Sequence, residues 1–167
     1  SDLAAVPKLQ FERNFTFHSQ RLKNNNLVAD AATTTFKYPT YYSHNLIRYA
    51  SEKQDIFEKH KVMIPNVGTL DNAFVGVDCN LTEDITFLSA NSHKEASMIL
   101  QLLHSTLFRF IGACYRQGRT LGIALRFLPH LDTSIAWTDS LIYLHFAFSQ
   151  QEIAYMSSQV QIGRAHV

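Results

Sequence analysis

The chain has 167 residues, of which 46% are hydrophobic and 17% charged, and its formal net charge at pH 7 is +1. This composition excludes an intrinsically disordered protein and allows one domain with a substantial core. No apolar run approaches the ~18 residues of a membrane span, and no secretory leader pattern is present, so we expect a cytoplasmic protein without a membrane partner. Cys79 and Cys114 lie far apart, and we interpret them as buried thiols in a reducing compartment.

Charge is distributed unevenly along the chain. Residues 1–51 hold six Lys or Arg and three acidic residues, whereas residues 52–95 hold four and eight. Residues 96–131 hold four arginines and no acidic residue. This last segment is a candidate for a surface that faces an anion.

The first half of the chain indicates short strands. Residues 1–50 are rich in Thr, Tyr and Phe, and we expect short irregular strands and loops there. Residues 51–61 resemble a short polar helix, and the apolar run 61–65 predicts a strand that ends at Pro65. Residues 73–79 and 85–90 are interpreted as two strands of a hairpin.

The clearest element is an amphipathic helix from about residue 94 to 115. Ser92 and Glu95 form an S-x-x-E capping box at its start. The apolar residues recur at steps of three and four, and we expect this stripe to face the core: Ile99, Leu100, Leu103, Leu107, Phe110, Ile111 and Cys114. Gly118 and Gly122 then flank a loop, and residues 123–129 predict a short strand.

Short helices are expected near the C-terminus. Thr138 is a candidate N-cap, and a second S-x-x-E box at Ser149 and Glu152 opens a further helix. We expect Trp137 and Phe146 to be structural, with Trp137 packing the entry loop onto its helix. The predicted fold is α+β: a single mixed domain with short strands, one long amphipathic helix and C-terminal short helices.

The final residues are set apart from this domain. The run IGRAHV, followed by a stop, matches the translation of a short sequencing adapter. We therefore assign residues 1–160 to the domain and predict that residues 161–167 are a non-native tail. The alternative is an ordinary frayed end.

Catalytic motifs are not found in the sequence. It has no Gly-rich phosphate loop, no GxSxG, no HExxH and no Asn-Pro-Pro-aromatic motif. The eight histidines show no metal-ligand spacing. We therefore assign no catalytic, cofactor-binding or metal-binding residue.

The C-terminal third carries a family resemblance. The stretch LPHLDTSIAWTDSLIYLHFAFSQQEIAYM resembles the end of adenine-specific DNA methyltransferases of restriction–modification systems. The matching positions are Leu128, Pro129, Leu131, Asp132, Trp137, Thr138, Asp139, Leu141, Tyr143, Phe146, Glu152, Ile153 and Tyr155. Upstream, KVMIP, FLSANSHKEASMILQLLHSTLFRFIGACYR and, more weakly, KYPTYYS extend the likeness, which spans residues 37–158.

The resemblance implies that catalysis and DNA recognition lie in different domains. In that family an upstream catalytic domain binds S-adenosylmethionine and carries the Asn-Pro-Pro-aromatic motif, and the later half is a target recognition domain that reads double-stranded DNA. Residues 1–160 would then be a fragment of that recognition domain, with no cofactor of its own. Its partners would be DNA and the upstream catalytic domain of the same protein.

A DNA reader needs cations for phosphates and side chains that reach base edges. Arg116, Arg119 and Arg126 lie in or beside the Gly-flanked loop after the long helix, and we predict that they contact DNA. The alternative is a solvated helix end, where basic residues complement the helix dipole.

Further DNA contacts are expected from the first half of the chain. Lys37, His44 and Arg48 lie among Tyr41 and Tyr42, and aromatic rings among cations can stack on a base. An ordinary aromatic sheet face explains the same residues. The run RLKNNN at 21–26 is a weaker candidate, and an Asn-rich turn is the alternative. Lys61 completes the predicted DNA-binding set.

Two other functions remain open at this point. The same module serves in the specificity part of a restriction endonuclease, and the sequence does not distinguish the two. A non-catalytic protein-interaction domain that docks through the long helix is the second alternative. Steep loss of affinity with salt would distinguish DNA binding from apolar docking.

Overall fold

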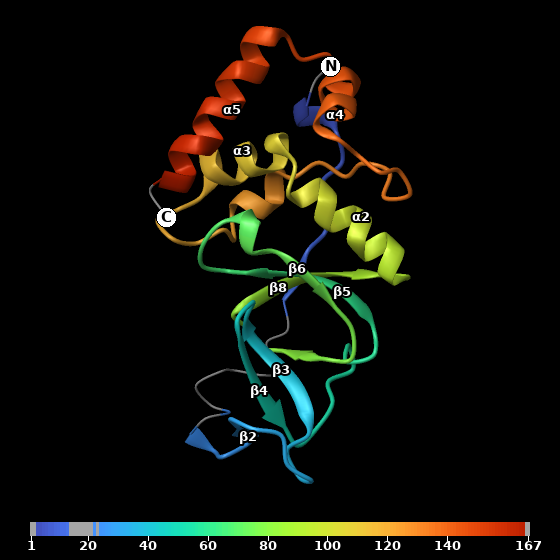
Figure 1. The fold of residues 1–167 in the computed structure, drawn as a ribbon, viewed down its shortest axis with the longest axis vertical. Coiled ribbons are helices and arrows are strands. Elements are labelled where there is room, and N and C mark those ends of the chain that lie inside the picture. The colour runs from blue at the N-terminus through green and yellow to red at the C-terminus, as the bar shows by residue number, and fades with distance from the viewer. Residues whose placement is uncertain (1–2, 14–21, 23, 166–167) are drawn as a thin grey trace.

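Strands from distant parts of the chain form two sheets, and helices gather at one end of the molecule (Figure 1). The computed structural model describes residues 3–13, 22 and 24–165. The first sheet lies in the middle and the second sheet lies at the end opposite the helices. The expected α+β class with short strands is confirmed.

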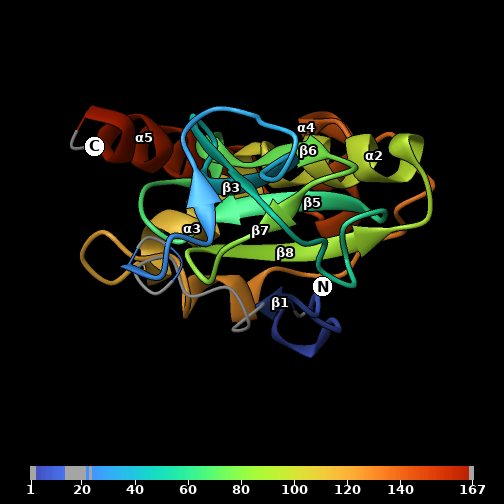
Figure 2. The same ribbon diagram turned by 90° about the horizontal axis from the view of Figure 1, so that it is seen from below.

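The first sheet has the strand order β1-β8-β5-β6 and is antiparallel throughout (Figure 2). Its strands are β1 (Glu12–Arg13), β5 (His60–Pro65), β6 (Phe74–Gly76) and β8 (Ile85–Ala90). The strand expected at 61–65 is confirmed, but the predicted hairpin of 73–79 with 85–90 is wrong. Val62 of β5 pairs with Val75 on one side and Leu88 on the other, so β5 separates the two strands. β5 therefore lies in the interior of the sheet and not at its edge, and its residues 61–65 are all buried.

The second sheet has the order β2-β4-β3-β7. Its strands are β2 (Val28–Ala29), β3 (Tyr38–Ser43), β4 (Leu46–Ala50) and β7 (Asn80–Leu81). β3 and β4 form a hairpin, and β7 runs parallel to β3. A small hydrophobic cluster joins the two sheets, because it combines Met63 and Phe87 of the first with Leu81 of the second. The short irregular strands expected in residues 1–50 are confirmed.

Residues 51–59 are not the polar helix that the sequence predicts, because buried side chains take over the hydrogen bonds of this segment. The Lys61 side chain is fully buried, and its Nζ donates to the carbonyls of Ile56 (2.8 Å), Phe57 (3.0 Å) and Lys59 (2.8 Å). Gln54 pairs with the backbone of Leu81: Nε2 donates to the carbonyl at 2.6 Å, and Oε1 accepts from the amide at 2.8 Å. The segment therefore forms irregular turns and lacks the backbone hydrogen bonds of a helix.

The helix predicted at 94–115 is two helices with a 62° bend between them. The helical elements are η1 (Leu3–Ala5), η2 (Leu70–Asn72), α2 (His93–Leu103), α3 (Thr106–Tyr115), η3 (Ala124–Phe127), α4 (Asp139–Phe146) and α5 (Gln150–Ala165). The break arises because the Ser105 hydroxyl caps a new helix, accepting from the amide of Phe108 at 3.4 Å. The apolar stripe faces the core in part: Ile99, Leu103, Leu107 and Ile111 are buried, Leu100 and Phe110 are half-buried, and Cys114 is exposed.

The predicted N-terminal caps are present. Ser92 accepts from the Glu95 amide at 3.1 Å, and Thr138 accepts from the Leu141 amide at 3.3 Å. Ser149 and Glu152 make both bonds of the capping box, at 2.9 and 3.1 Å. α5 continues to Ala165, into the segment assigned to the non-native tail, whose origin stays a prediction.

The strand predicted at 123–129 is wrong, because the 3₁₀ helix η3 occupies its centre. Ala124 and Leu125 point into the core, which an extended strand with alternating sides does not allow for neighbouring residues.

The interpretation of both cysteines as buried is wrong for Cys114, which is exposed. Cys79 is buried, and both thiols are free.

One carboxylate connects α3 to α4. Asp139 accepts hydrogen bonds from the amide (2.9 Å) and the hydroxyl (2.7 Å) of Thr106, the first residue of α3. Asp139 is itself the first residue of α4. The positive ends of both helix dipoles therefore meet at the same negative charge.

Trp137 is structural, as expected. Its side chain is buried in the main core, and its indole Nε1 donates to the carbonyl of Asp132 at 2.9 Å. The ring also meets the His145 ring edge to face, at a centroid distance of 5.2 Å. Trp137 thus fastens the loop 132–137 onto α4.

Replacing Lys61 by Met should lower the free energy of unfolding by about 2–4 kcal/mol, because three carbonyls lose their donor, that of Phe57 buried and those of Ile56 and Lys59 partly buried. Burial also lowers the pKa of the Lys61 ammonium, with Cys79 opposing the shift, because removing the charged group from water is unfavourable. The hydrogen bonds to the carbonyls offset this desolvation cost. Urea unfolding measures the change. The matched control is Lys59→Met, since Lys59 is exposed. Equal stability of the two variants would contradict this role.

Replacing Trp137 by Ala should cost about 3–5 kcal/mol of stability, because a buried aromatic side chain leaves a cavity. Thermal or urea unfolding followed by far-UV circular dichroism measures it. Tyr155→Ala is the control, since Tyr155 is 58% exposed. A loss no larger than that of the control would show that the loop does not need its aromatic anchor.

Candidate nucleic-acid interface

The loop that follows α3 is held in a defined shape by backbone hydrogen bonds. Gln117 and Thr120 exchange amide-to-carbonyl bonds of 3.1 and 3.0 Å across a tight turn. Gly118 occupies the first central position with φ of 59°, a conformation that favours glycine. The Gly68 amide donates to the carbonyl of Arg119 at 2.9 Å, which ties the turn to the segment after β5. We call residues 116–126 the arginine loop.

The three arginines predicted to act together point to different places. Arg119 is exposed at the turn, and Arg126 is exposed on η3. Arg116 is half-buried, and its Nη1 donates to the carbonyl of Gly68 at 3.1 Å. Arg116 therefore lies against the segment before η2, away from the surface that carries Arg126.

A groove of about 710 Å³ opens beside the arginine loop. It is lined by the chain between residues 8 and 13, by Asn66 and Thr86 of the first-sheet region, and by the arginine loop between residues 120 and 126. Three cations contribute to it: Lys8, Arg13 and Arg126. Among the described residues that line the groove, none is acidic. We call this feature the basic groove.

Backbone carbonyls orient two of the groove's cations. Lys8 Nζ donates to the carbonyls of Leu3 (3.2 Å) and Ala4 (3.3 Å) in η1, and also to Val6. Arg13 Nη2 donates to the carbonyl of Glu83 at 2.9 Å. Carbonyl dipoles carry no net charge, so these hydrogen bonds do not neutralise the Lys8 ammonium.

A hydrogen-bonded pair forms part of the groove wall. Thr86 Oγ1 donates to Asn66 Oδ1 at 2.7 Å, and Asn66 Nδ2 donates to the carbonyl of Glu83 at 3.0 Å. These bonds fix the orientation of the Asn66 amide. The groove thus combines fixed polar groups with positive charge, which is the chemistry that polyanion binding requires.

Lys8 and Arg13 were not predicted as site residues. They reach the groove because the N-terminal segment pairs with residues 128–130. The Leu9 amide donates to the carbonyl of Leu128 at 2.9 Å, and the His130 amide donates to the carbonyl of Pro7 at 2.7 Å. Nothing in the local sequence indicates such a long-range pairing. Only the excess of positive charge in residues 1–51 pointed in this direction.

The second predicted cluster lies on the second sheet, and none of its residues lines the groove. Lys37 and His44 are exposed, with the Lys37 ammonium 5.4 Å from the centroid of the Tyr38 ring. Arg48 is engaged internally: its guanidinium lies 5.0 Å from the Tyr42 ring centroid and 3.5 Å from Asp30. The aromatic sheet face, given above as the alternative, describes this arrangement well.

Two tyrosines of this cluster are turned toward the protein. The Tyr41 ring packs on Phe74 at a centroid distance of 4.9 Å. The Tyr42 hydroxyl is buried and has no hydrogen-bond partner among the described residues. Burial raises the pKa of Tyr42, and Arg48 opposes the shift. Both residues are half-buried, and their rings contact Phe74 and Arg48.

One further predicted contact is contradicted by the geometry, and another stays a prediction. Lys61 is fully buried with its ammonium on three carbonyls, so its assignment as a DNA contact is wrong. In the run RLKNNN, Arg21 and Lys23 lie outside the described residues, and Asn24, Asn25 and Asn26 are exposed.

Among residues 3–13, 22 and 24–165, no group of three or more His, Cys, Asp or Glu is placed to hold a metal ion. In the same residues no single helix has the length and apolar character to cross a membrane, although α2 and α3 together meet these two criteria despite their bend.

No protein-family model, curated protein or solved structure matches the chain.

Proposed function

We propose that the chain binds double-stranded DNA through the basic groove and the arginine loop. The observation that carries the proposal is the groove itself: three cations line it, and no acidic residue does among those described. Arg119 extends the positive surface from the adjacent turn. Polyphosphate backbones bind such surfaces because each neutralised phosphate releases a counterion.

The groove residues divide into two roles in this proposal. Backbone carbonyls orient the side chains of Lys8 and Arg13, and we assign both residues to the phosphate backbone. Arg126 and Arg119 are exposed and extend from the loop, so their planar donors can reach a phosphate or a guanine edge. Arg116 is excluded from this set because it points to Gly68.

The resemblance to adenine-specific DNA methyltransferases supports the wider role. We propose that the chain is the target recognition part of such an enzyme, in a restriction–modification system of the cytoplasm, and that an upstream domain binds S-adenosylmethionine and transfers the methyl group. Adenine must leave the duplex for this reaction. The recognition part would hold the DNA while the catalytic domain receives the base. The specificity part of a restriction endonuclease is the alternative within the same class.

A protein-interaction domain remains the second candidate, but not through the long helix. The apolar stripe of α2 and α3 is already buried in the core. The observation that favours docking is instead on α4 and α5, where Leu144 is 78% and Tyr155 58% exposed. In the proposed enzyme, this surface is available to the catalytic domain.

Affinity for duplex DNA should fall steeply with salt. Four phosphate contacts, from Lys8, Arg13, Arg119 and Arg126, predict a loss of about 100-fold between about 50 and about 200 mM salt. The double substitution Arg119→Gln and Arg126→Gln should reduce the slope of log affinity against log salt by about two, because two counterions fewer are released. Fluorescence anisotropy with a labelled duplex measures both quantities.

The matched control is Lys94→Gln, which removes one exposed charge outside the groove. It should leave the salt slope unchanged. If the double arginine variant behaves like Lys94→Gln, the basic groove does not bind DNA. If affinity is insensitive to salt in the parent chain as well, the docking alternative is favoured.

Methyl transfer and DNA binding should separate between the two parts of the proposed enzyme. With the upstream domain present, incorporation of labelled methyl groups into duplex DNA is expected, and in its absence binding should persist while incorporation is lost. A chain that methylates DNA alone would contradict the assignment of catalysis to the upstream domain. So would a gene whose upstream part encodes no domain that binds a methyl donor.

A further inference from the structure

Two exposed aromatic rings are stacked on each other at the two ends of the arginine loop. Tyr115 is the last residue of α3, and Phe127 is the last residue of η3. Their ring centroids are 4.0 Å apart, and the ring planes differ by 12°. Tyr115 is 46% and Phe127 38% exposed, so much of this stack remains in contact with water. We call these two side chains the ring pair.

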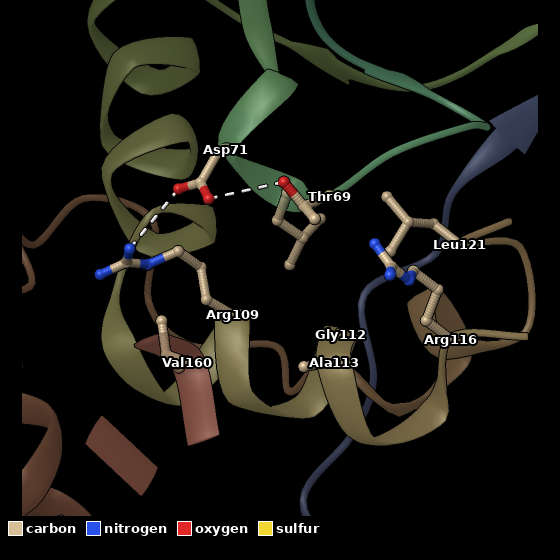
Figure 3. A pocket seen from close by; sticks show the side chains of 9 residues that line it. Thr69, Asp71, Arg109, Gly112, Ala113, Arg116, Leu121 and Val160 are labelled. Carbon is tan, nitrogen blue, oxygen red and sulfur yellow. Dashed lines mark hydrogen bonds and ion pairs between the residues drawn. The ribbon is translucent and has the colours of Figure 1, made fainter. Parts of the chain in front are cut away.

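Hydrogen bonds fix the backbone that carries both rings. Figure 3 shows the small cavity beside α3, with Arg116 on one of its walls. Arg116 Nη1 donates to the carbonyl of Gly68 at 3.1 Å, which holds the residue next to Tyr115 in place. At the end of η3, the Leu128 amide donates to the carbonyl of Leu125 at 3.4 Å. Both rings therefore start from fixed backbone positions, which lowers the entropy cost of binding a ligand on them.

The ring pair lies at the border of the basic groove. Phe127 follows Arg126, which lines the groove, and it precedes Leu128. The Leu128 carbonyl accepts from the amide of Leu9 at 2.9 Å, and Leu9 lines the groove as well. Consecutive Cα atoms are about 3.8 Å apart, so the backbone of Phe127 adjoins both the loop and the N-terminal wall of the groove.

Rings and charges together indicate the chemistry of the ligand. Every nucleobase has a flat π-face that stacks on aromatic side chains. Arg119 and Arg126 are exposed in the same segment, and residues 96–131 contain no acidic residue. A nucleic-acid strand offers flat bases and phosphates, so it complements the rings and the arginines together. An apolar protein segment complements only the rings.

The base that stacks on the ring pair has to be unpaired. Inside a duplex, the neighbouring base pairs cover both faces of each base, and unstacking a paired base costs free energy. A base without a partner turns out of the strand at a lower cost and can place one face on a ring.

We propose that the ring pair binds an unpaired nucleobase of DNA by stacking, while the adjoining duplex lies in the basic groove. This inference rests on the proposed DNA binding and specifies the form of DNA that the site prefers. Tyr115 and Phe127 supply the stacking surface, and Arg126 binds a nearby phosphate.

Fluorescence anisotropy with two labelled duplexes tests the proposal, when the duplexes differ only by one bulged adenine. The parent chain should bind the bulged duplex about tenfold more tightly, because one stacked base contributes affinity of this order. A third duplex with an abasic bulge should bind like the paired one, since it keeps the flexible backbone but lacks the base.

The double substitution Tyr115→Leu and Phe127→Leu should abolish the preference for the bulged duplex. Leucine keeps an apolar side chain but has no flat face, and affinity for the paired duplex should be unchanged. Phe127→Tyr alone should keep the preference. The matched control is Tyr155→Leu, which removes an exposed ring that packs edge to face on Phe110, away from the ring pair.

A spectroscopic measurement reports stacking directly. The fluorescent adenine analogue 2-aminopurine, placed at the bulge, loses emission when it stacks on a ring. The parent chain should quench this emission, and the double leucine variant should not. If the double variant does not fold by circular dichroism, Phe127→Leu alone should reduce both the quenching and the preference.

The outcomes separate this inference from the proposed function. Equal affinity of the parent chain for bulged and paired duplexes overturns stacking but leaves DNA binding by the groove intact. A preference that the abasic bulge shares also overturns it, because DNA flexibility would then explain the gain. So does a preference that the leucine variants retain. No binding to any of the three duplexes overturns both proposals.

Discussion

The ammonium group of Lys61 is the interaction on which the arrangement of the two sheets depends. It is fully buried at the start of the central strand β5, and it collects the carbonyls of the turns 55–59. The same irregular segment reaches the second sheet through Asn80, whose Nδ2 donates to the carbonyl of Glu52 (2.9 Å) and to Thr40 Oγ1 (3.2 Å). A buried polar network of this kind fixes one geometry, because each partner that is lost leaves a buried group unsatisfied.

The candidate DNA-binding surface is built on the first sheet and depends on pairing between distant segments. The N-terminal residues bind along Leu128 and Pro129, and the arginine loop binds along Asn66 and Gly68. These two backbone pairings bring residues 8–13 and 120–126 together around one groove. Arg116 belongs to the same loop, but it donates to the carbonyl of Gly68 and does not line this groove.

Local signals in the sequence predicted local structure. The caps at Ser92, Thr138 and Ser149 depend on residues within one turn, and all three are present. The helix break was missed because Ser105 is compatible with a helix interior, and its role as a cap depends on the bend. Lys61 was misassigned because its burial depends on carbonyls that only the folded turn presents.

In the candidate site, too, local signals were predicted from the sequence and long-range contacts were not. Arg119 and Arg126 were predicted from an acid-free segment, and the structure leaves both exposed. Lys8 is placed by its pairing with Pro129 and Arg13 by its pairing with Thr86 of β8, and no local pattern encodes either long-range contact.

The carboxylate of Asp139 has a consequence for how this part of the chain tolerates change. Because it closes the first turns of both α3 and α4, the two helices cannot be re-angled independently. A graft, a circular permutation or a swap between related chains that exchanges one helix without the other would separate the acceptor from its donors. Residues 105–146 should therefore be inherited and engineered as one block.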